Sequence, residues 1–262
     1  MARSLLLIKL GGSAITSKDR PLTPRLDVLK WVAEDVRELL EDYKVVLVHG
    51  GGSFGHPVAE KYRLHEGLSE SRQLLGYCEV RYWMTYLNQL LVRELLEAGA
   101  PAATLHTSSV VVAREGEIAR FDASILRRFL DLGLVPIMYG DVVLDEVLGA
   151  CVVSGDKLVS RLALELRPER VVLGTDVDGI YTDDPKENPR ARHLETLSLS
   201  RITELMFKRP KHDVTGGMLA KLSEMGEVVR SGIEVVVGDI TRPRGLLALA
   251  GKRAERFTII VP

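Results

Sequence analysis

The sequence predicts an α/β protein built on a mostly parallel sheet. Short apolar runs that stop at glycine alternate with amphipathic stretches along all 262 residues, as in chains of strand–helix–strand units. The apolar runs are continuous, which is typical of parallel strands buried on both faces. No repeat, low-complexity segment or linker interrupts the pattern, so we expect one domain over residues 1–262.

The first half of the chain combines two buried strands with two long helices. The run SLLLIKL at 4–10 ends in Gly-Gly and predicts the first strand. Apolar residues three and four apart over 24–41 predict a helix with one buried face, and KVVLVHG at 44–50 predicts the second strand. A helical pattern extends over 71–98, and the Gly-Ala-Pro that follows ends it.

The second half continues the alternation with shorter elements. SVVVA at 109–113 and GEIARF at 116–121 predict a hairpin, because the turn-forming REG joins them. We then expect, in chain order, a helix at 123–133, a strand at 134–140, a helix at 154–166, a strand at 170–176, a helix at 213–232, a strand at 233–239 and a closing strand at 256–262. A functional division into two lobes would fall near residues 145–155.

Composition argues against several classes of function. The formal net charge is −1, so no basic field indicates a nucleic-acid partner. No apolar run approaches the roughly 20 residues of a membrane-spanning helix, and the apolar segment near the N-terminus is too brief for a secretion signal. Cys78 and Cys151 stand far apart and predict neither a disulfide framework nor a zinc site. We therefore expect a cytoplasmic protein with no membrane or nucleic-acid partner.

Polar residues gather where the predicted strands end. LGGS, HGGGSFGH, YGD and LGTDVDG each follow an apolar run, and parallel sheets bind ligands beyond the carboxyl ends of their strands. Gly50, Gly52 and Gly55 also match GxGxxG, which would indicate a nicotinamide oxidoreductase. That fingerprint belongs to a first strand, whereas this match follows the second. We interpret the glycines as an anion nest of backbone N–H groups; the alternative is a plain tight turn.

Three lysines and one aspartate accompany the glycines. Lys9 lies in a strand of Leu and Ile, so it either faces anionic oxygens at the strand end or faces water from an edge strand. Lys18 follows in a loop, where a surface charge is the alternative. Lys221 lies in the first turns of a helix whose Gly-Gly start would seat a phosphate. Asp156 begins another helix, where it orders the lysines or caps the helix.

These features together predict phosphoryl transfer, which needs cations and backbone donors but little covalent chemistry from the protein. No GxxxxGK[ST] occurs, so the chain is not a P-loop protein. The acidic stretch 174–185 lacks EF-hand spacing, and a solvated turn is its alternative. The ordered set IKLGGS, HGGGSFGHP, YGDVV, SGDKL, GTDVDGIYTDDP and DVTGGMLAKL resembles the amino acid kinase family over essentially the whole chain.

This resemblance implies a fold and a set of partners. The implied fold is a three-layer αβα sandwich with a mostly parallel central sheet, in which 1–150 binds the acceptor and 151–262 binds the nucleotide. ATP and Mg²⁺ are the implied cofactors, and the magnesium is held mainly by ATP oxygens and water, with no protein ligand to the metal. A homodimer is implied as well.

The resemblance also implies a role for each matching residue. Lys9 and Lys221 would grip the transferring phosphoryl group, Lys18 would stabilise the transition state, and Asp156 would hold the catalytic lysines in place. The implied ATP contacts are Gly11, Gly12, Ser13, Gly52 and Gly217 at the phosphates, and Thr175, Asp176, Gly179 and Tyr181 at the base and ribose. The implied acceptor contacts are Gly51, Gly55, His56 and Gly155.

The SFGH that follows the first glycines restricts the class of acceptor that the enzyme would phosphorylate. Family members that phosphorylate carboxylates share HGGG without it, and a closing His56 suits an acceptor that is already a phosphate, because histidine donates to phosphate oxygens. The resemblance therefore implies phosphorylation of isopentenyl phosphate to isopentenyl diphosphate by direct in-line transfer. Fosfomycin or another small phosphate or phosphonate is the alternative acceptor. Uridylate kinases lack the closing His, and a sensor without catalysis would not need every lysine.

An acceptor with a short apolar tail needs apolar walls. The helix at 77–91 offers Tyr77, Val80, Tyr82, Met84 and Leu87, although any one of them could instead belong to the core or to a dimer contact. His49, which ends the second strand, is interpreted as a structural residue.

Overall fold

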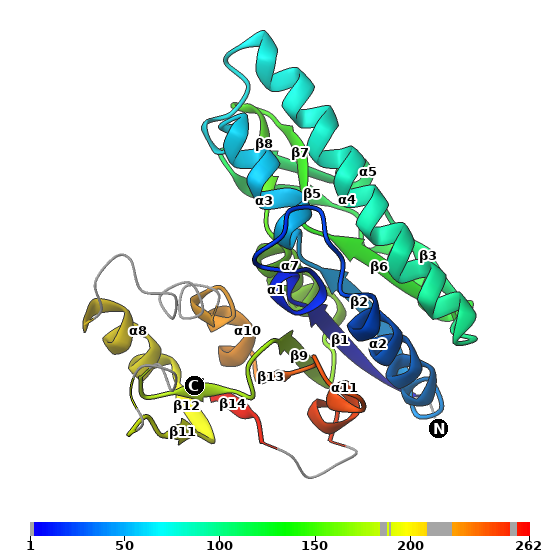
Figure 1. Ribbon diagram of the computed structural model, residues 1–262, viewed down its shortest axis with the longest axis vertical. Helices are drawn as coiled ribbons and strands as arrows, with labels where there is room; N and C mark the ends of the chain where they lie inside the picture. The colour runs from blue at the N-terminus through cyan, green and yellow to red at the C-terminus, as the bar shows by residue number, and fades with distance from the viewer. Residues whose placement is uncertain (1–2, 184–187, 189, 209–221, 252–255) are drawn as a thin grey trace.

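A computed structural model describes residues 3–183, 188, 190–208, 222–251 and 256–262. Within these residues, eight strands form one sheet in the order β12-β14-β13-β9-β1-β2-β6-β3 (Figure 1). They are β1 (Ser4–Leu10), β2 (Tyr43–His49), β3 (Ala102–Thr104), β6 (Val135–Tyr139), β9 (Arg170–Thr175), β12 (Thr196–Ser198), β13 (Glu234–Asp239) and β14 (Thr258–Val261). Every neighbouring pair is parallel except β13 and β14. The mostly parallel sheet is therefore confirmed.

Helices cover both faces of this sheet. They are α1 (Gly12–Ile15), α2 (Leu26–Leu39), α3 (Gly52–Lys61), α4 (Ser71–Glu97), α5 (Thr107–Val110), α6 (Ser124–Asp131), α7 (Gly155–Leu166), α8 (Leu199–Lys208), α10 (Gly226–Arg230) and α11 (Gly245–Leu249), with a 3-10 turn at Leu64–Glu66. Leu6, Ile8 and Leu10 of β1 share a core with α2, α4 and α11, whereas Leu7 shares one with α6, α7 and α10. Two cores on opposite faces make the three-layer αβα sandwich that the sequence predicts.

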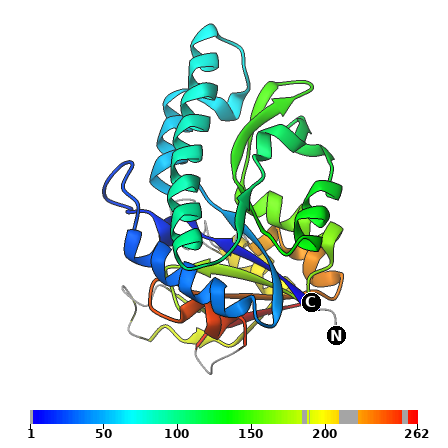
Figure 2. The same cartoon turned by 90° about the vertical axis from the view of Figure 1, so that its right-hand side faces the viewer.

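A second sheet lies beside α4, in the order β5-β4-β7-β8. Its strands are β4 (Val111–Arg114), β5 (Glu117–Phe121), β7 (Asp141–Asp145) and β8 (Gly149–Val153), and a separate pair joins β10 (Ile180–Tyr181) to β11 (His193–Leu194). Figure 2 shows the four-stranded sheet and α4 extending together from one side of the main sheet.

One carboxylate joins the two turns of the four-stranded sheet. Asp145 accepts hydrogen bonds from the backbone N–H groups of Glu115 and Gly116 in one turn and of Val147 and Leu148 in the other. Burial alone would raise the pKa of Asp145, but these four donors outweigh burial and hold the pKa well below its ordinary value. In its ionised form, Asp145 therefore holds the two turns of this sheet together.

The expected elements of the chain are found, with three local differences. HGGGSFGH, expected as a loop, passes into α3 at Gly52, so Gly55 and His56 are helical. The first residues of the expected strand 109–113 belong to α5. The helix expected at 213–232 is interrupted by a turn at Glu224 and Met225, before α10, in the part that the structure describes. The strands β7 and β8 were not expected.

The main sheet extends across the boundary expected between two lobes, because β9 pairs directly with β1. The division of labour between 1–150 and 151–262 stays a prediction. Among the described residues, no helix combines the length and apolar character that crossing a membrane requires.

Candidate active site

Glycine backbones bring the ends of neighbouring strands into contact. A Cβ on Gly12, after β1, would lie 2.3 Å from the backbone nitrogen of Gly52, after β2. A Cβ on Gly140, after β6, would lie 2.8 Å from the backbone nitrogen of Gly155. Neither position has room for a side chain, so exposed backbone lines this edge of the sheet. We call the set the glycine cluster: Gly11, Gly12, Gly50, Gly51, Gly52, Gly140 and Gly155.

Two helices begin at the glycine cluster. Gly51 is the N-cap of α3, and Ser154 caps α7 by accepting a hydrogen bond from the Lys157 backbone N–H at 3.1 Å. The first N–H groups of a helix lack partners inside the helix and carry a partial positive charge. Gly52 has φ +46, which suits glycine. Two helix N-termini at one edge form a seat for anionic groups.

Lys9 and Asp156 form a buried ion pair beside the cluster. Lys9 is at the carboxyl end of β1 on the face covered by α7, and Asp156 is in the first turn of that helix. Lys9 Nζ lies 2.7 Å from Asp156 Oδ1, and both side chains are about a tenth exposed. The edge-strand alternative for Lys9 is wrong, because β2 and β9 flank β1. The capping alternative for Asp156 is also wrong, because Ser154 is the cap.

Lys18 and Ser13 both bind Asp176, which follows β9. Lys18 Nζ lies 2.6 Å from Asp176 Oδ2, and the Ser13 hydroxyl donates to Asp176 Oδ1 at 2.8 Å. Burial alone would raise the pKa of Asp176, but the hydrogen bonds from Lys18 and Ser13 outweigh it and hold the pKa below its ordinary value. Sequence analysis assigned Lys18 and Asp176 to different ligands and did not foresee their contact, which spans two distant chain segments.

The segment that carries Lys18 is fixed to α3. Pro57 has no N–H to donate to Ser53 four residues earlier, and the Leu22 backbone N–H donates to the Ser53 carbonyl instead, at 3.3 Å. The Ser53 N–H in turn donates to Thr16 Oγ1 at 3.0 Å. These bonds hold the 16–22 segment beside the glycine cluster.

A cavity of about 290 Å³ opens at the glycine cluster. Its polar lining includes Lys9, His56, Asp141 and Asp156, together with backbone of the cluster. His56 is exposed in the second turn of α3. Asp141 is buried, and burial raises its pKa to about 6. Sequence analysis missed Asp141, although it follows the glycine of YGD directly.

Another part of the cavity wall is apolar and comes from α3, α4 and β8. Its apolar residues are Ala59, Val80, Met84, Val152 and Val153. Cβ atoms on Gly51 and Gly55 would lie 3.1 and 3.0 Å from Met84 Sδ, so these glycines let α4 approach closely. Of the suggested wall residues, only Val80 and Met84 line this cavity within the described chain.

The other three suggested wall residues lie elsewhere. Leu87 belongs to the core under β1, and Tyr77 packs against the small cluster around Tyr139. Tyr82 is 63% exposed. Val152 comes from a strand that the sequence pattern did not reveal, so it could not be suggested from sequence.

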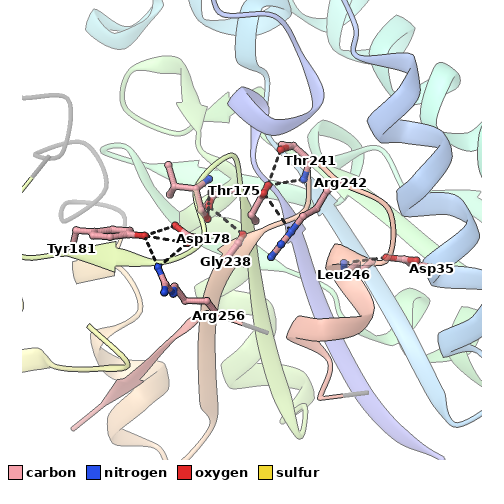
Figure 3. Close-up of polar contacts among 11 residues, drawn as sticks. Asp35, Thr175, Asp178, Tyr181, Gly238, Thr241, Arg242, Leu246 and Arg256 are labelled. Carbon is pink, nitrogen blue, oxygen red and sulfur yellow. Dashed lines mark hydrogen bonds and ion pairs between the residues drawn. The ribbon is translucent and has the colours of Figure 1, made fainter. Parts of the chain in front are cut away.

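Side-chain hydrogen bonds order the loops after β9 and β13 (Figure 3). The buried Thr175 hydroxyl lies within hydrogen-bond distance of the Gly238 carbonyl at 3.1 Å. Tyr181 donates to Asp178 at 2.8 Å, and Arg256 reaches both residues. We call this set the β9–β13 cluster: Thr175, Asp178, Tyr181, Gly238, Asp239, Thr241 and Arg256. Sequence analysis missed Asp239, which accepts from the Thr241 N–H and hydroxyl at 2.7 Å each.

Two further predicted residues touch the β9–β13 cluster or its sheet. The Gly11 N–H donates to the Gly174 carbonyl at 2.8 Å, which joins the glycine cluster to β9. Gly179 has φ +138, and a Cβ there would lie 2.3 Å from His193 Nε2. Gly179 is therefore required by its backbone conformation, and Gly11 by a close approach, because a Cβ on Gly11 would lie 2.8 Å from the Gly174 carbonyl oxygen. Gly217 and Lys221 lie outside the described residues.

The residues present suit a bound phosphate group. The glycine cluster, two helix N-termini and Lys9 offer donors and positive charge to phosphate oxygens. Among the described residues, no group of three or more His, Cys, Asp or Glu side chains could hold a metal ion. Asp156 and Asp176 are both engaged by lysines.

Comparison with known proteins places the chain among kinases. The model of the amino acid kinase family matches residues 4–239. Isopentenyl phosphate kinase from Methanothermobacter thermautotrophicus is 39% identical over 97% of this chain and 99% of its own length, and that from Methanocaldococcus jannaschii is 34% identical over 83% and 85%. A crystal structure of isopentenyl phosphate kinase superposes with a TM-score of 0.84 at 35% identity and covers 98% of this chain and 100% of its own.

Proposed function

The chain belongs to the amino acid kinase family, and from that premise we propose that it transfers the terminal phosphoryl group of ATP to isopentenyl phosphate, giving isopentenyl diphosphate. One observation supports the choice of isopentenyl phosphate as the acceptor. The cavity has a polar, glycine-lined end at Lys9 and an apolar wall at Val80 and Met84. A phosphate head on a short hydrocarbon tail matches both, whereas a nucleoside monophosphate would set polar groups against the apolar wall.

The acceptor phosphate binds at the start of α3. The Gly51 N–H and the Gly155 N–H are donors at two helix N-termini, and His56 adds a side-chain donor from the exposed side. Hydrogen bonds to a charged oxygen are stronger than neutral ones, and more so when His56 is protonated. The tail then lies along Met84, Val80 and Val152, where it leaves water.

Transfer proceeds in line, from the terminal phosphorus of ATP to an acceptor oxygen. The acceptor oxygen forms a new bond to phosphorus as the bond to the ADP oxygen breaks, so the charge that develops lies on the transferring oxygens. Lys9 faces that charge and is held there by Asp156. Lys18 reaches the same region once it leaves Asp176. The acceptor is already an anion, so the step needs no general base.

ATP lies across the carboxyl ends of β1 and β9. Its phosphates would contact Gly11, Gly12, Ser13 and Gly52, and its base and ribose would contact the segment from Thr175 to Tyr181. Gly217 and Lys221 complete the phosphate contacts in the family pattern. Mg²⁺ would neutralise phosphate charge and would be held mainly by ATP oxygens and water, since it keeps several waters when bound.

An ADP-release assay tests this function. Purified protein, ATP and Mg²⁺ are combined with isopentenyl phosphate, fosfomycin, UMP or N-acetylglutamate in parallel. We expect fast ADP release with isopentenyl phosphate and little with the others, and ³¹P NMR should identify the diphosphate product. Turnover of fosfomycin in preference to isopentenyl phosphate would contradict the acceptor assignment but leave phosphoryl transfer in place.

The His56→Ala variant tests the acceptor donor directly. Loss of one hydrogen bond to a charged oxygen, worth about 1.5–3 kcal/mol, lowers kcat/KM for isopentenyl phosphate by roughly 10- to 100-fold, and KM for ATP stays unchanged. His56→Gln, which keeps a donor, recovers part of the loss. His65→Ala removes an exposed histidine from the 3-10 turn and serves as the matched control. Wild-type activity in His56→Ala would remove this role.

The family pattern also implies a homodimer, and the composition leads us to expect a cytoplasmic protein. Sedimentation equilibrium of the purified protein tests the dimer. Fractionation of the native cells tests the cytoplasmic location. A monomer at every concentration would contradict the dimer.

A further inference from the structure

His49 is fully buried at the end of β2, directly before the glycine cluster, and none of the roles above uses it. Its Nδ1 lies 3.1 Å from the carbonyl oxygen of Gly50. Burial lowers the pKa of His49 to about 4, so the ring is neutral near pH 7 and has a single N–H. A contact between Nδ1 and a carbonyl oxygen requires that this N–H be on Nδ1.

The Gly50–Gly51 peptide is the first one beyond the sheet. The peptide before it is fixed on both sides, because the Gly50 N–H donates to Leu10 and the His49 carbonyl accepts from Gly140. The next peptide joins two glycines, which accept more backbone conformations than other residues. The backbone hydrogen bonds between neighbouring strands end there, so another group must set the direction of that peptide.

The bond from His49 determines where the Gly51 N–H points. In a trans peptide the C=O and the N–H point in opposite directions. The Gly50 carbonyl points to the buried imidazole, so the Gly51 N–H points away from it. Gly50 and Gly51 both line the cavity. Within the described residues, no hydrogen bond uses the Gly51 N–H.

Neighbouring side chains hold the imidazole in place. Its ring stacks on Tyr139, with centroids 5.0 Å apart and planes 27° apart. The Tyr139 hydroxyl lies 2.6 Å from His106 Nδ1 and 3.3 Å from Thr85 Oγ1. The aromatic partner is thus fixed from two further elements, α4 and the start of α5.

Asn88 completes the surroundings of the ring. It lies beside His49, and both His49 Nε2 and Asn88 Oδ1 are buried without a hydrogen-bond partner. Asn88 Nδ2 lies 2.6 Å from Thr104 Oγ1. With the amide turned by half a turn, Nδ2 would donate to Nε2 and the Thr104 hydroxyl would donate to Oδ1. That arrangement would also place the ring proton on Nδ1.

We infer that His49 is a positioning residue for phosphoryl transfer: its Nδ1–H holds the Gly50 carbonyl inward and so aims the Gly51 N–H at the acceptor phosphate. The direction of the N–H stands on the geometry of this chain, and the identity of its ligand rests on the proposed function. His49 touches neither substrate, so its effect falls on acceptor binding and turnover rather than on ATP binding.

The tautomer is tested first, in the unmodified protein. ¹⁵N NMR of the histidine rings, with His49→Asn used to assign the His49 signals among the 6 histidines, should show its proton on Nδ1. Addition of inorganic phosphate should move the Gly51 amide signal in the wild type and much less in His49→Leu. A proton on Nε2 would overturn the inference. These readings need no turnover, so they stand or fall independently of the proposed function.

Kinetics of His49 variants then separate positioning from packing. Asn places an amide nitrogen close to the position of Nδ1, whereas Leu fills space without a donor. We expect His49→Leu to lower kcat/KM for isopentenyl phosphate by roughly 10- to 100-fold, the range for one charge-assisted hydrogen bond, with KM for ATP unchanged. His49→Asn should regain most of the loss, and Tyr139→Phe, which keeps the stacked ring, should change little.

Two kinetic results would overturn the inference. One is full activity in a folded His49→Leu variant, and the other is a His49→Asn variant no better than His49→Leu. If neither variant folds, the inference is tested by the His49 tautomer and by the phosphate titration of the wild type.

Discussion

The glycine cluster and the β9–β13 cluster lie on the same edge of one sheet but keep their shape in different ways. In the glycine cluster, backbone meets backbone, as where Gly12 and Gly52 leave no space for a Cβ. In the β9–β13 cluster, side chains fix the loops, as where Asp239 binds Thr241 and Asp178 binds Tyr181 (Figure 3).

This difference indicates how well each cluster tolerates substitutions. Steric contact between backbones cannot relax locally, so one added methyl group must separate two strand ends. A side-chain hydrogen bond between partly exposed groups contributes about 0.5–1.5 kcal/mol, and its loss leaves the backbone in place. Substitutions at the glycine cluster should therefore lower activity strongly, whereas each substitution at the β9–β13 cluster should lower it only modestly.

The largest effect is expected for Lys9→Met. It removes a positive charge from the transferring phosphoryl group, and loss of one such stabilising group costs about 100- to 1,000-fold in kcat. It also leaves Asp156 buried without its lysine, which destabilises by about 3–5 kcal/mol. The double variant Lys9→Met, Asp156→Asn removes both charges, so it should regain stability but not activity. Activity restored together with stability would show that Lys9 only supports the fold.

The next largest effect is expected for Gly12→Ala. Its Cβ would lie 2.3 Å from the Gly52 nitrogen, and a displacement near 1 Å in an active site costs about 100-fold in rate. Gly226→Ala is the matched control, because its Cβ would meet only the Arg230 guanidinium, at 3.4 Å. Steady-state kinetics and thermal melting of both variants check this. Equal activity of Gly12→Ala and Gly226→Ala would contradict the proposed intolerance of the glycine cluster to added side chains.

A smaller effect is expected for Tyr181→Phe. The hydroxyl links Asp178 to Arg256, and its loss should raise KM for ATP by roughly 2- to 10-fold, the range of one partly exposed hydrogen bond, with KM for the acceptor unchanged. Tyr82→Phe, at an exposed position on α4, is the control. A change in acceptor KM alone would contradict the assignment of this cluster to the nucleotide.

The smallest effect on activity is expected for Asp35→Asn, far from both clusters. Burial raises the pKa of Asp35 to about 6, although it accepts hydrogen bonds from the Leu247 and Leu246 N–H groups. A carboxyl whose pKa is higher in the folded state favours folding when protonated. The wild type should therefore lose stability as pH rises from about 4 to about 6, by at most about 3 kcal/mol.

Asp35→Asn lacks that ionisation, so its stability should change less over the same pH range. Urea unfolding at several pH values between about 4 and 7 measures this, and kcat should match the wild type. An unchanged pH profile of stability in the variant would show that Asp35 ionises normally in the folded protein.

Sequence patterns predicted the sheet and singled out Lys9 and Asp156, because these features follow local rules. Lys9 was identified by its charge within an apolar strand, and Asp156 by its place at a helix start. Their ion pair depends on β1 and α7 packing together, which no local pattern encodes. The Lys18–Asp176 contact is hidden for the same reason, since 158 residues separate the two along the chain.

The helix α3 was missed because Gly and Pro are poor helix formers. The structure supplies what the local sequence lacks: Phe54 is buried in the core, and the Leu22 N–H takes the place of the one that Pro57 cannot offer. The strands β7 and β8 were missed because the segment around YGDVV was interpreted as a strand end alone. Val152, which lines the cavity, could therefore not be identified from the sequence.

The most direct test is a crystal structure with isopentenyl phosphate bound. The account predicts the phosphate within hydrogen-bond distance of His56 and the Gly51 N–H, with the tail along Val80 and Met84. A phosphate bound instead at Thr175 and Tyr181, with the cavity beside Met84 filled by water, would contradict it.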